Sequence, residues 1–268
     1  MSTPRILDRL GGLTPLRRCL VGGVVAGSLA VAIPGVAGAS STAAPANLRT
    51  TVSSIKATAS SLRDAGVSAI APRCESAITN RQTQIDVLNN RIAVAKWLTS
   101  SHHSSLSGDL SAASSGLTSL NGQIQGATTL EQLAPLCKDI VENFRIYVLR
   151  TPQVHLTIGG DAETAVVSKL QGIAPKLDAA IKAAQAKGQD VGNAPTLYAD
   201  FTAKVADAAS KSDGASDQVV ALTVAGYNAG TAKPVLQTTY QNLVLAHGDL
   251  IAARQDAQQI VQILTARH

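Results

Sequence analysis

An all-α fold, a bundle of long up-and-down helices, is predicted by three features of this sequence. Aromatic residues make up 3% of the 268 residues and charged residues 15%. Aliphatic residues recur at intervals of seven in two segments, with cap residues and glycines between segments. So few aromatic residues disfavour a β-sandwich or barrel, whose strands rely on aromatic and β-branched side chains.

The order of residue types over 1–39 predicts a secretory signal peptide. Arginines precede an uncharged apolar segment over 19–36, and Ala37 and Ala39 then stand at positions −3 and −1 of a cleavage site that would leave Ser40 first. This order of basic, apolar and small residues is typical of an export signal. A retained membrane anchor is the alternative, although several glycines interrupt an apolar segment near the lower length limit for a span.

The export route stays open between Sec and twin-arginine export, because Arg17 and Arg18 form a pair before the apolar segment. Four of the 23 basic residues and one of the 18 acidic residues lie in the signal, so the net charge falls from +5 to about +2 after cleavage. The remaining basic residues are scattered singly, which disfavours nucleic-acid binding. No stable membrane span remains once the signal is removed.

After the signal, we expect a flexible leader over 40–46 and one secreted helical-bundle domain over 47–268, with two halves meeting near residue 160 as one arrangement. Cys19 leaves with the signal, and Cys74 and Cys137 remain. An even cysteine count in an oxidising compartment predicts one disulfide; two free buried thiols are the alternative.

The first helices are expected over 47–65, from Pro72 to about Ser101, and over 104–125. The second of these carries a coiled-coil-like heptad stripe in which one arginine is the polar exception. That stripe consists of Ile78, Arg81, Ile85, Leu88, Ile92 and Ala95. His102, His103 and the serines around them are expected to form the turn before the third helix.

The segment 137–158 admits two interpretations. A Thr-Thr-Leu-Glu-Gln run at 128–132 opens a helix as a capping signature. That helix could continue to Ile158 with a kink at Pro152, or residues 144–158 could form a hairpin with its turn at 150–153. The helical surroundings favour the kinked helix.

Four further helices are expected toward the C-terminus. Gly159, Gly160 and Asp161 are expected to end the kinked helix and cap a new one that runs to about Lys187. Shorter helices follow over about 195–210 and 216–226. The last helix, over about 232–267, carries the clearest heptads, with a second coiled-coil-like seam of alternating large and small residues. That seam consists of Leu236, Thr239, Leu243, Ala246, Leu250, Ala253, Ala257, Ile260 and Leu264.

Catalytic and metal motifs are missing from the sequence. It contains no His-Glu-x-x-His, Gly-x-Ser-x-Gly, P-loop or Gly-x-Gly-x-x-Gly pattern, and no Glu-x-x-His pair or Cys-x-x-Cys spacing. We therefore predict no catalytic site, no metal site and no cofactor. His102 and His103 with Asp109 could bind a metal loosely, but a solvated turn is preferred because adjacent histidines on a helix point to different sides.

One polar and aromatic cluster near the expected kink is the candidate ligand site. Its residues are Arg145, Tyr147, Arg150 and His155. Together they could line a pocket for an anionic or ring-bearing ligand. A packed kink, in which His155 meets a backbone carbonyl, is the preferred interpretation.

Three stretches carry a resemblance to a known group of proteins: FRIYVLRTPQVH at 144–155, AGYNA at 225–229 and DLIAARQDA at 249–257. With the signal peptide, the chain resembles uncharacterised secreted all-helical proteins of actinobacteria. The resemblance covers most of residues 47–267 and implies export and an all-α fold. It implies no active site.

These observations favour an exported non-enzymatic helical protein that acts through its surface in the cell envelope or the medium. The alternative is a carrier of a small ligand or metal that uses the region around Pro152. The partner is unknown, and self-association through the C-terminal heptads or contact with an envelope protein through helix faces are the two candidates.

Overall fold

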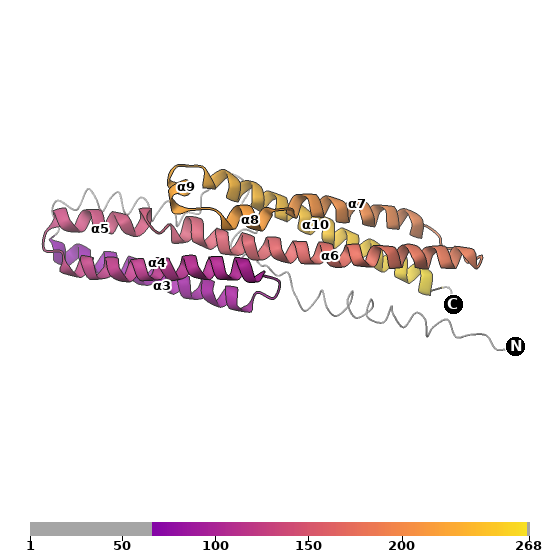
Figure 1. Cartoon of the computed structure of the whole chain (residues 1–268), viewed down its shortest axis with the longest axis horizontal. Helices are drawn as coiled ribbons and strands as arrows, with labels where there is room; N and C mark the ends of the chain where they lie inside the picture. Colours follow the sequence, from indigo (N-terminus) through magenta and orange to yellow (C-terminus); the bar gives the residue numbers. More distant parts are fainter. Residues whose placement is uncertain (1–65, 267–268) are drawn as a thin grey trace. The chain divides into compact units, whose positions relative to one another are not determined.

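The computed structural model describes residues 66–266 (Figure 1). The predicted signal peptide over 1–39, its cleavage site between Ala39 and Ser40, the leader over 40–46 and the helix predicted over 47–65 lie outside the described residues.

The described part of the chain confirms the all-α class, because residues 66–266 contain helices packed against each other and no strand. Its elements are α3 (Val67–Val94), α4 (Ser100–Gly126), α5 (Leu130–Glu142), the π-helical turn η4 (Ile146–Arg150), α6 (Thr151–Ala186), α7 (Ala194–Ser212), α8 (Ala215–Val220), α9 (Val224–Asn228) and α10 (Ala232–Thr265). Within these residues, no helix combines the length and apolarity that a membrane crossing requires.

The chain forms two compact units. We call the one that contains residues 66–166 and 209–246 the disulfide unit, and the one that contains Val167–Ala208 and 247–266 the second unit. Helices α6 and α10 contribute residues to both, so neither unit is a continuous half of the chain.

The core of the disulfide unit is aliphatic and is built first of all from α3, α4 and α5. Helices α3 and α4 lie side by side and are joined by a short turn over 95–99 (Figure 1). The heptad positions of α3 pack against leucines of α4 and α5. The most deeply buried of these side chains are Ile78, Ile85, Leu88, Ile92, Leu110, Leu117, Ile124 and Leu133.

Side-chain caps set where α4 and α5 begin. The Thr99 hydroxyl accepts a hydrogen bond from the His102 N–H at the start of α4. Thr129 and Gln132 form the capping box that the sequence predicted for α5. Each cap satisfies an N–H group that the first turn of a helix leaves free.

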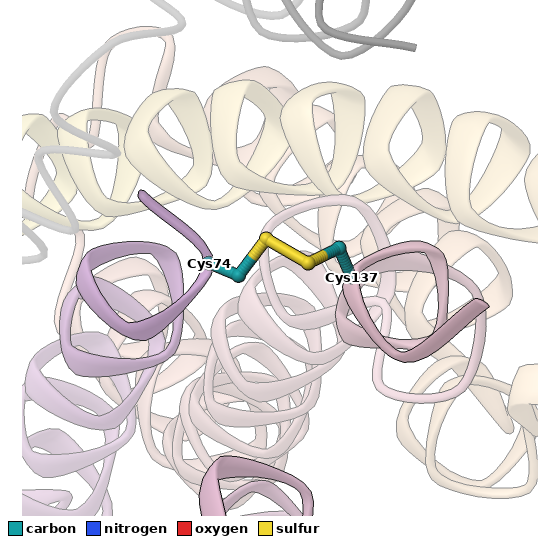
Figure 2. Close-up of a disulfide and its surroundings, with 2 residues drawn as sticks. All are labelled: Cys74 and Cys137. Carbon is teal, nitrogen blue, oxygen red and sulfur yellow. A yellow bond between two sulfur atoms is a disulfide. The ribbon is translucent and has the colours of Figure 1, made fainter. Parts of the chain in front are cut away.

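A disulfide joins α3 to α5 through Cys74 and Cys137, as the sequence predicted (Figure 2). The two cysteines are 63 residues apart, so the loop that the bridge closes in the unfolded chain is long. Chain entropy gives such a bridge a stabilisation of about 4 kcal/mol. A disulfide is compatible with a location outside the cytoplasm.

A second apolar cluster of the disulfide unit brings together α8, α9 and the parts of α6 and α10 that belong to this unit. Its buried residues are Leu149, Leu156, Ala215, Val219, Ala232, Leu236 and Leu243. Tyr227 of α9 and Tyr240 of α10 pack against it half-buried. The short helix α8 therefore depends on α6 and α10 for its burial.

The second unit has its own core around α7. Phe201 is fully buried, and the Tyr198 ring lies 6.3 Å from it, centroid to centroid. The Lys204 ammonium group donates to the Asp256 carboxylate at 2.6 Å. Asp256 is only 7% exposed, so this ion pair compensates the burial of its charge.

The heptad pattern predicted the buried side of α10. The residues at these positions are buried from Leu236 to Ile260. Leu264, at the last heptad position, is half-buried.

Several expected helix boundaries were wrong. Helix α3 begins at Val67 and ends at Val94, so Ala95 of the predicted stripe lies beyond it, and the helix expected over 216–226 is divided into α8 and α9. The turn after α3 ends at Thr99, and His102 and His103 lie in the first turn of α4. Gly159 and Gly160 do not end a helix, because α6 continues through them from Thr151 to Ala186. A Cβ atom on Gly160 would lie 2.4 Å from the Ser216 Oγ and 3.3 Å from its backbone nitrogen, so this glycine lets α8 approach α6 closely.

The segment expected to be a helix with a kink at Pro152 is helical but is interrupted earlier. Helix α5 ends at Glu142, Arg145 adopts a left-handed backbone, and η4 leads into α6. Pro152 is the second residue of α6. The hairpin interpretation is excluded, since residues 144–158 contain no strand.

Replacing Gly160 by alanine is expected to lower the free energy of unfolding by about 1–3 kcal/mol, because the added methyl group overlaps Ser216. Urea unfolding followed by circular dichroism measures the change.

The matched control is Gly108→Ala, since a Cβ atom on this exposed residue of α4 has nothing within 4 Å. This variant is expected to gain about 0.5–1 kcal/mol from helix propensity. A Gly160→Ala variant as stable as Gly108→Ala would contradict the close approach of α8.

Candidate functional site

The connection between α5 and α6 is the most irregular part of the disulfide unit. Arg145 has φ of 47°, and no other non-glycine residue in the described part of the chain has a positive φ. The N–H groups of Leu149 and Arg150 both donate to the Arg145 carbonyl, which produces the wide π-helical turn. Pro152 follows and has no N–H to continue the regular pattern.

Contacts with α9 offset the cost of the Arg145 backbone, which is about 1–2 kcal/mol for a left-handed residue. The Arg145 guanidinium lies 5.6 Å from the centre of the Tyr227 ring, and its Nε donates to Asn228 Oδ1 at 2.6 Å. The Asn228 side chain in turn donates to the carbonyl of Glu142 at the end of α5. The short helix α9 is thereby attached to the connection.

Tyr147 faces α3. The guanidinium carbon of Arg81 lies 5.3 Å from the centre of the Tyr147 ring, and Arg81 donates to the Ala77 carbonyl of its own helix. Arg81 is 6% exposed, and burial lowers the pKa of its guanidinium, with Tyr147 acting in the opposite direction. The polar exception in the α3 heptads is therefore a cation held over an aromatic ring.

Arg150 and Gln153 connect α6 to α4 and α8. Arg150 pairs with Asp109 of α4 and donates to the Gln153 side-chain oxygen at 2.8 Å. Gln153 is fully buried, and its amide nitrogen lies 2.9–3.0 Å from three carbonyl oxygens at the end of α8. These carbonyls belong to Val219, Val220 and Leu222. Gln153 thus caps the C-terminus of α8.

His155 is half-buried on α6. Burial, assisted by the positive charge of Arg91 on α3, lowers the pKa of its imidazole to about 4. The ring is therefore neutral at ordinary pH.

The four residues of the predicted ligand cluster have separate partners. Arg145 contacts α9, Tyr147 meets Arg81 of α3, Arg150 pairs with Asp109 of α4, and His155 is influenced by Arg91. The contacts of Arg145, Tyr147 and Arg150 are those of residues that hold neighbouring helices together.

A buried polar cluster that the sequence did not reveal surrounds His102. His102 is 9% exposed as a whole residue, whereas the neighbouring His103 is exposed. Its Nδ1 lies 2.9 Å from the carboxylate oxygens of Asp161 on α6, and its Nε2 lies 2.9 Å from Asp217 Oδ1 on α8. Asp161 also accepts a hydrogen bond from the Thr99 N–H at 2.8 Å. Three helices meet at one imidazole ring.

This arrangement differs from the usual geometry of a catalytic or metal-binding histidine. Both ring nitrogens of His102 face carboxylates, so neither is directed at a hydroxyl or thiol nucleophile. The carboxylates also lie at opposite nitrogens of the ring. Within residues 66–266, no group of three or more His, Cys, Asp or Glu side chains is placed to hold a metal ion.

Comparison with protein-family models, with curated proteins and with solved structures found no match for this chain.

The low pKa of His155 predicts that the protein loses stability in mild acid. The unfolded chain takes up a proton near the ordinary pKa of 6.5, whereas the folded chain does so near 4. The contribution of His155 is therefore complete above about pH 6.5 and is lost as the pH falls toward 4. Urea unfolding between these pH values is expected to show a smaller pH dependence in His155→Gln than in the wild type.

His103→Gln serves as the control, because His103 is exposed on the first turn of α4. It should retain the wild-type pH dependence. Equal slopes for the wild type and His155→Gln would contradict the burial of a neutral imidazole.

Proposed function

We propose that this chain is an exported, non-enzymatic helical protein that acts through its surface in the cell envelope or the medium. The observation that carries the proposal is the Cys74–Cys137 disulfide, because such bridges persist in oxidising compartments. The basic, apolar and small residues of 1–39 support export, and the resemblance to secreted helical proteins of actinobacteria agrees with it.

The use of the polar side chains supports a non-enzymatic role. Three buried polar side chains make structural contacts: His102 joins three helices, Gln153 caps α8, and Arg81 stacks on Tyr147. The same holds for Arg145, Tyr147 and Arg150 of the ligand cluster, so the carrier alternative gains no support from their contacts.

Exposed apolar side chains on α3 and α10 support an action through helix surfaces. They are Val87, Val94, Val244, Leu245 and Ile251. Val87 and Val94 are one heptad apart on α3, and Val94 is 80% exposed. Coiled-coil-like contact of such a face with an envelope protein or a second copy is part of the proposal.

Export is tested by expressing the full chain in an actinobacterial host and fractionating the culture. The expected product lies in the envelope or medium, begins at Ser40 by mass spectrometry, and contains the Cys74–Cys137 bridge. An Ala39→Asp variant should remain uncleaved, since the −1 position requires a small residue. Replacing Arg17 and Arg18 by lysine blocks export only on the twin-arginine route. A full-length product retained in the cytoplasm would overturn the proposal.

The exported protein is then incubated with purified cell walls and with envelope membranes from the same host. Co-sedimentation without release of soluble fragments is expected, and Val94→Glu should reduce the bound fraction because it places a charge on the exposed face. Lys138→Glu, a change at a residue of α5 with a 67% exposed side chain, is the matched surface control. Release of soluble fragments by the purified wild-type protein would establish an enzyme instead.

A further inference from the structure

The contacts of His102 require two ring protons. A neutral imidazole carries one N–H, whereas the protonated ring carries two. Asp161 lies at Nδ1 and Asp217 at Nε2, both at 2.9 Å, and a carboxylate only accepts hydrogen bonds. Both contacts are therefore hydrogen bonds only when His102 is charged.

The two carboxylates differ in what they lose when the ring is deprotonated. The Asp161 side chain is 6% exposed and also accepts a hydrogen bond from the Thr99 N–H. Bulk water therefore cannot replace His102 as its hydrogen-bond donor. The Asp217 side chain is 79% exposed. The single remaining proton therefore stays on Nδ1 toward Asp161, and the lone pair on Nε2 faces the negative charge of Asp217.

Helix α8 is too short to hold its position alone, because it contains the six residues Ala215–Val220. Its first half is attached by Asp217 to His102 and by the Ser216 hydroxyl, which donates to the Thr157 carbonyl. Its C-terminal end is attached by Gln153. Of these attachments, the one to His102 depends on a titrating group.

We propose that His102 is a pH-sensitive latch that holds the first half of α8 against α4 and α6 when protonated and releases Asp217 when it loses its proton. Among the described residues, the charged groups that act on the ring are Asp161 of α6 and Asp217 of α8. His103, its neighbour on α4, is exposed.

The sign of the pH effect follows from these groups. Burial lowers the pKa of His102, but the hydrogen bonds and negative charges of Asp161 and Asp217 outweigh it, so the pKa lies above its ordinary value of 6.5. The latch therefore contributes fully below about pH 6.5 and is lost as the pH rises through the pKa of the folded state. The stabilisation by His102 is thus lost above pH 6.5, whereas the contribution of His155 is lost below pH 6.5.

Amide hydrogen exchange of the purified protein tests the latch. Protection factors of the amides in Ala215–Val220 are expected to fall about threefold to tenfold between roughly pH 5.5 and 8.5, the scale of one exposed ion pair. Protection in α3 should stay constant. Titration of the His102 ring nitrogens by NMR should give a pKa above 6.5.

Asp217→Asn is the decisive variant, because Asp217 is exposed and its loss leaves the core intact. In this variant the pH dependence of α8 protection is expected to be lost, because a side-chain amide can accept from the charged ring and donate to the neutral ring, and the pKa of His102 should fall. His103→Gln is the matched control and should keep the wild-type behaviour. Constant protection in wild-type α8, an unchanged fall in Asp217→Asn, or a His102 ring that titrates at or below 6.5 would each overturn the proposal. None of these outcomes depends on what the protein binds.

Discussion

The structure of the disulfide unit depends on the requirement that buried carbonyl groups find hydrogen-bond donors. Helix α8 ends with its carbonyls in the interior, and the fully buried amide of Gln153 supplies their donor. Arg150 positions the Gln153 oxygen and pairs with Asp109 of α4. One chain of polar contacts thus connects α4, α6 and α8, and it brings Asp217 within reach of His102.

Polar contacts matter in this chain because its apolar side chains are small. With 3% aromatic residues in the sequence, the core is made mainly of Leu, Ile, Val and Ala, which pack closely but carry little directional information. Buried hydrogen bonds add that specificity, since a misplaced partner leaves a polar group unsatisfied. The cation–ring contacts of Arg81 and Arg145 have the same effect on α3 and α9.

Local sequence signals predicted the structure correctly where the residues that determine it lie close together in the sequence. The capping box of Thr129 and Gln132 and the buried face of α10 were predicted on this basis, whereas the disulfide was predicted from the even cysteine count. Local signals gave wrong predictions where a contact with a residue distant in the sequence determines the structure. Gly160 was expected to end a helix, but its lack of a side chain is what lets Ser216 approach. His102 was expected in a solvated turn, but the structure buries it against partners that lie 59 and 115 residues away in the sequence.

The three polar attachments of α8 differ in chemistry, because only the one through His102 titrates, and this difference limits what a change of pH can do. An amide such as Gln153 does not titrate, so the C-terminal end of α8 and the core residue Val219 stay in place at any moderate pH. His102 titrates, and its exposed partner Asp217 lies in the first half of the helix. Loss of the proton therefore loosens one short segment while the disulfide and the α3–α4–α5 core keep the unit folded. A local response of this kind changes the surface around Asp217 without unfolding the protein.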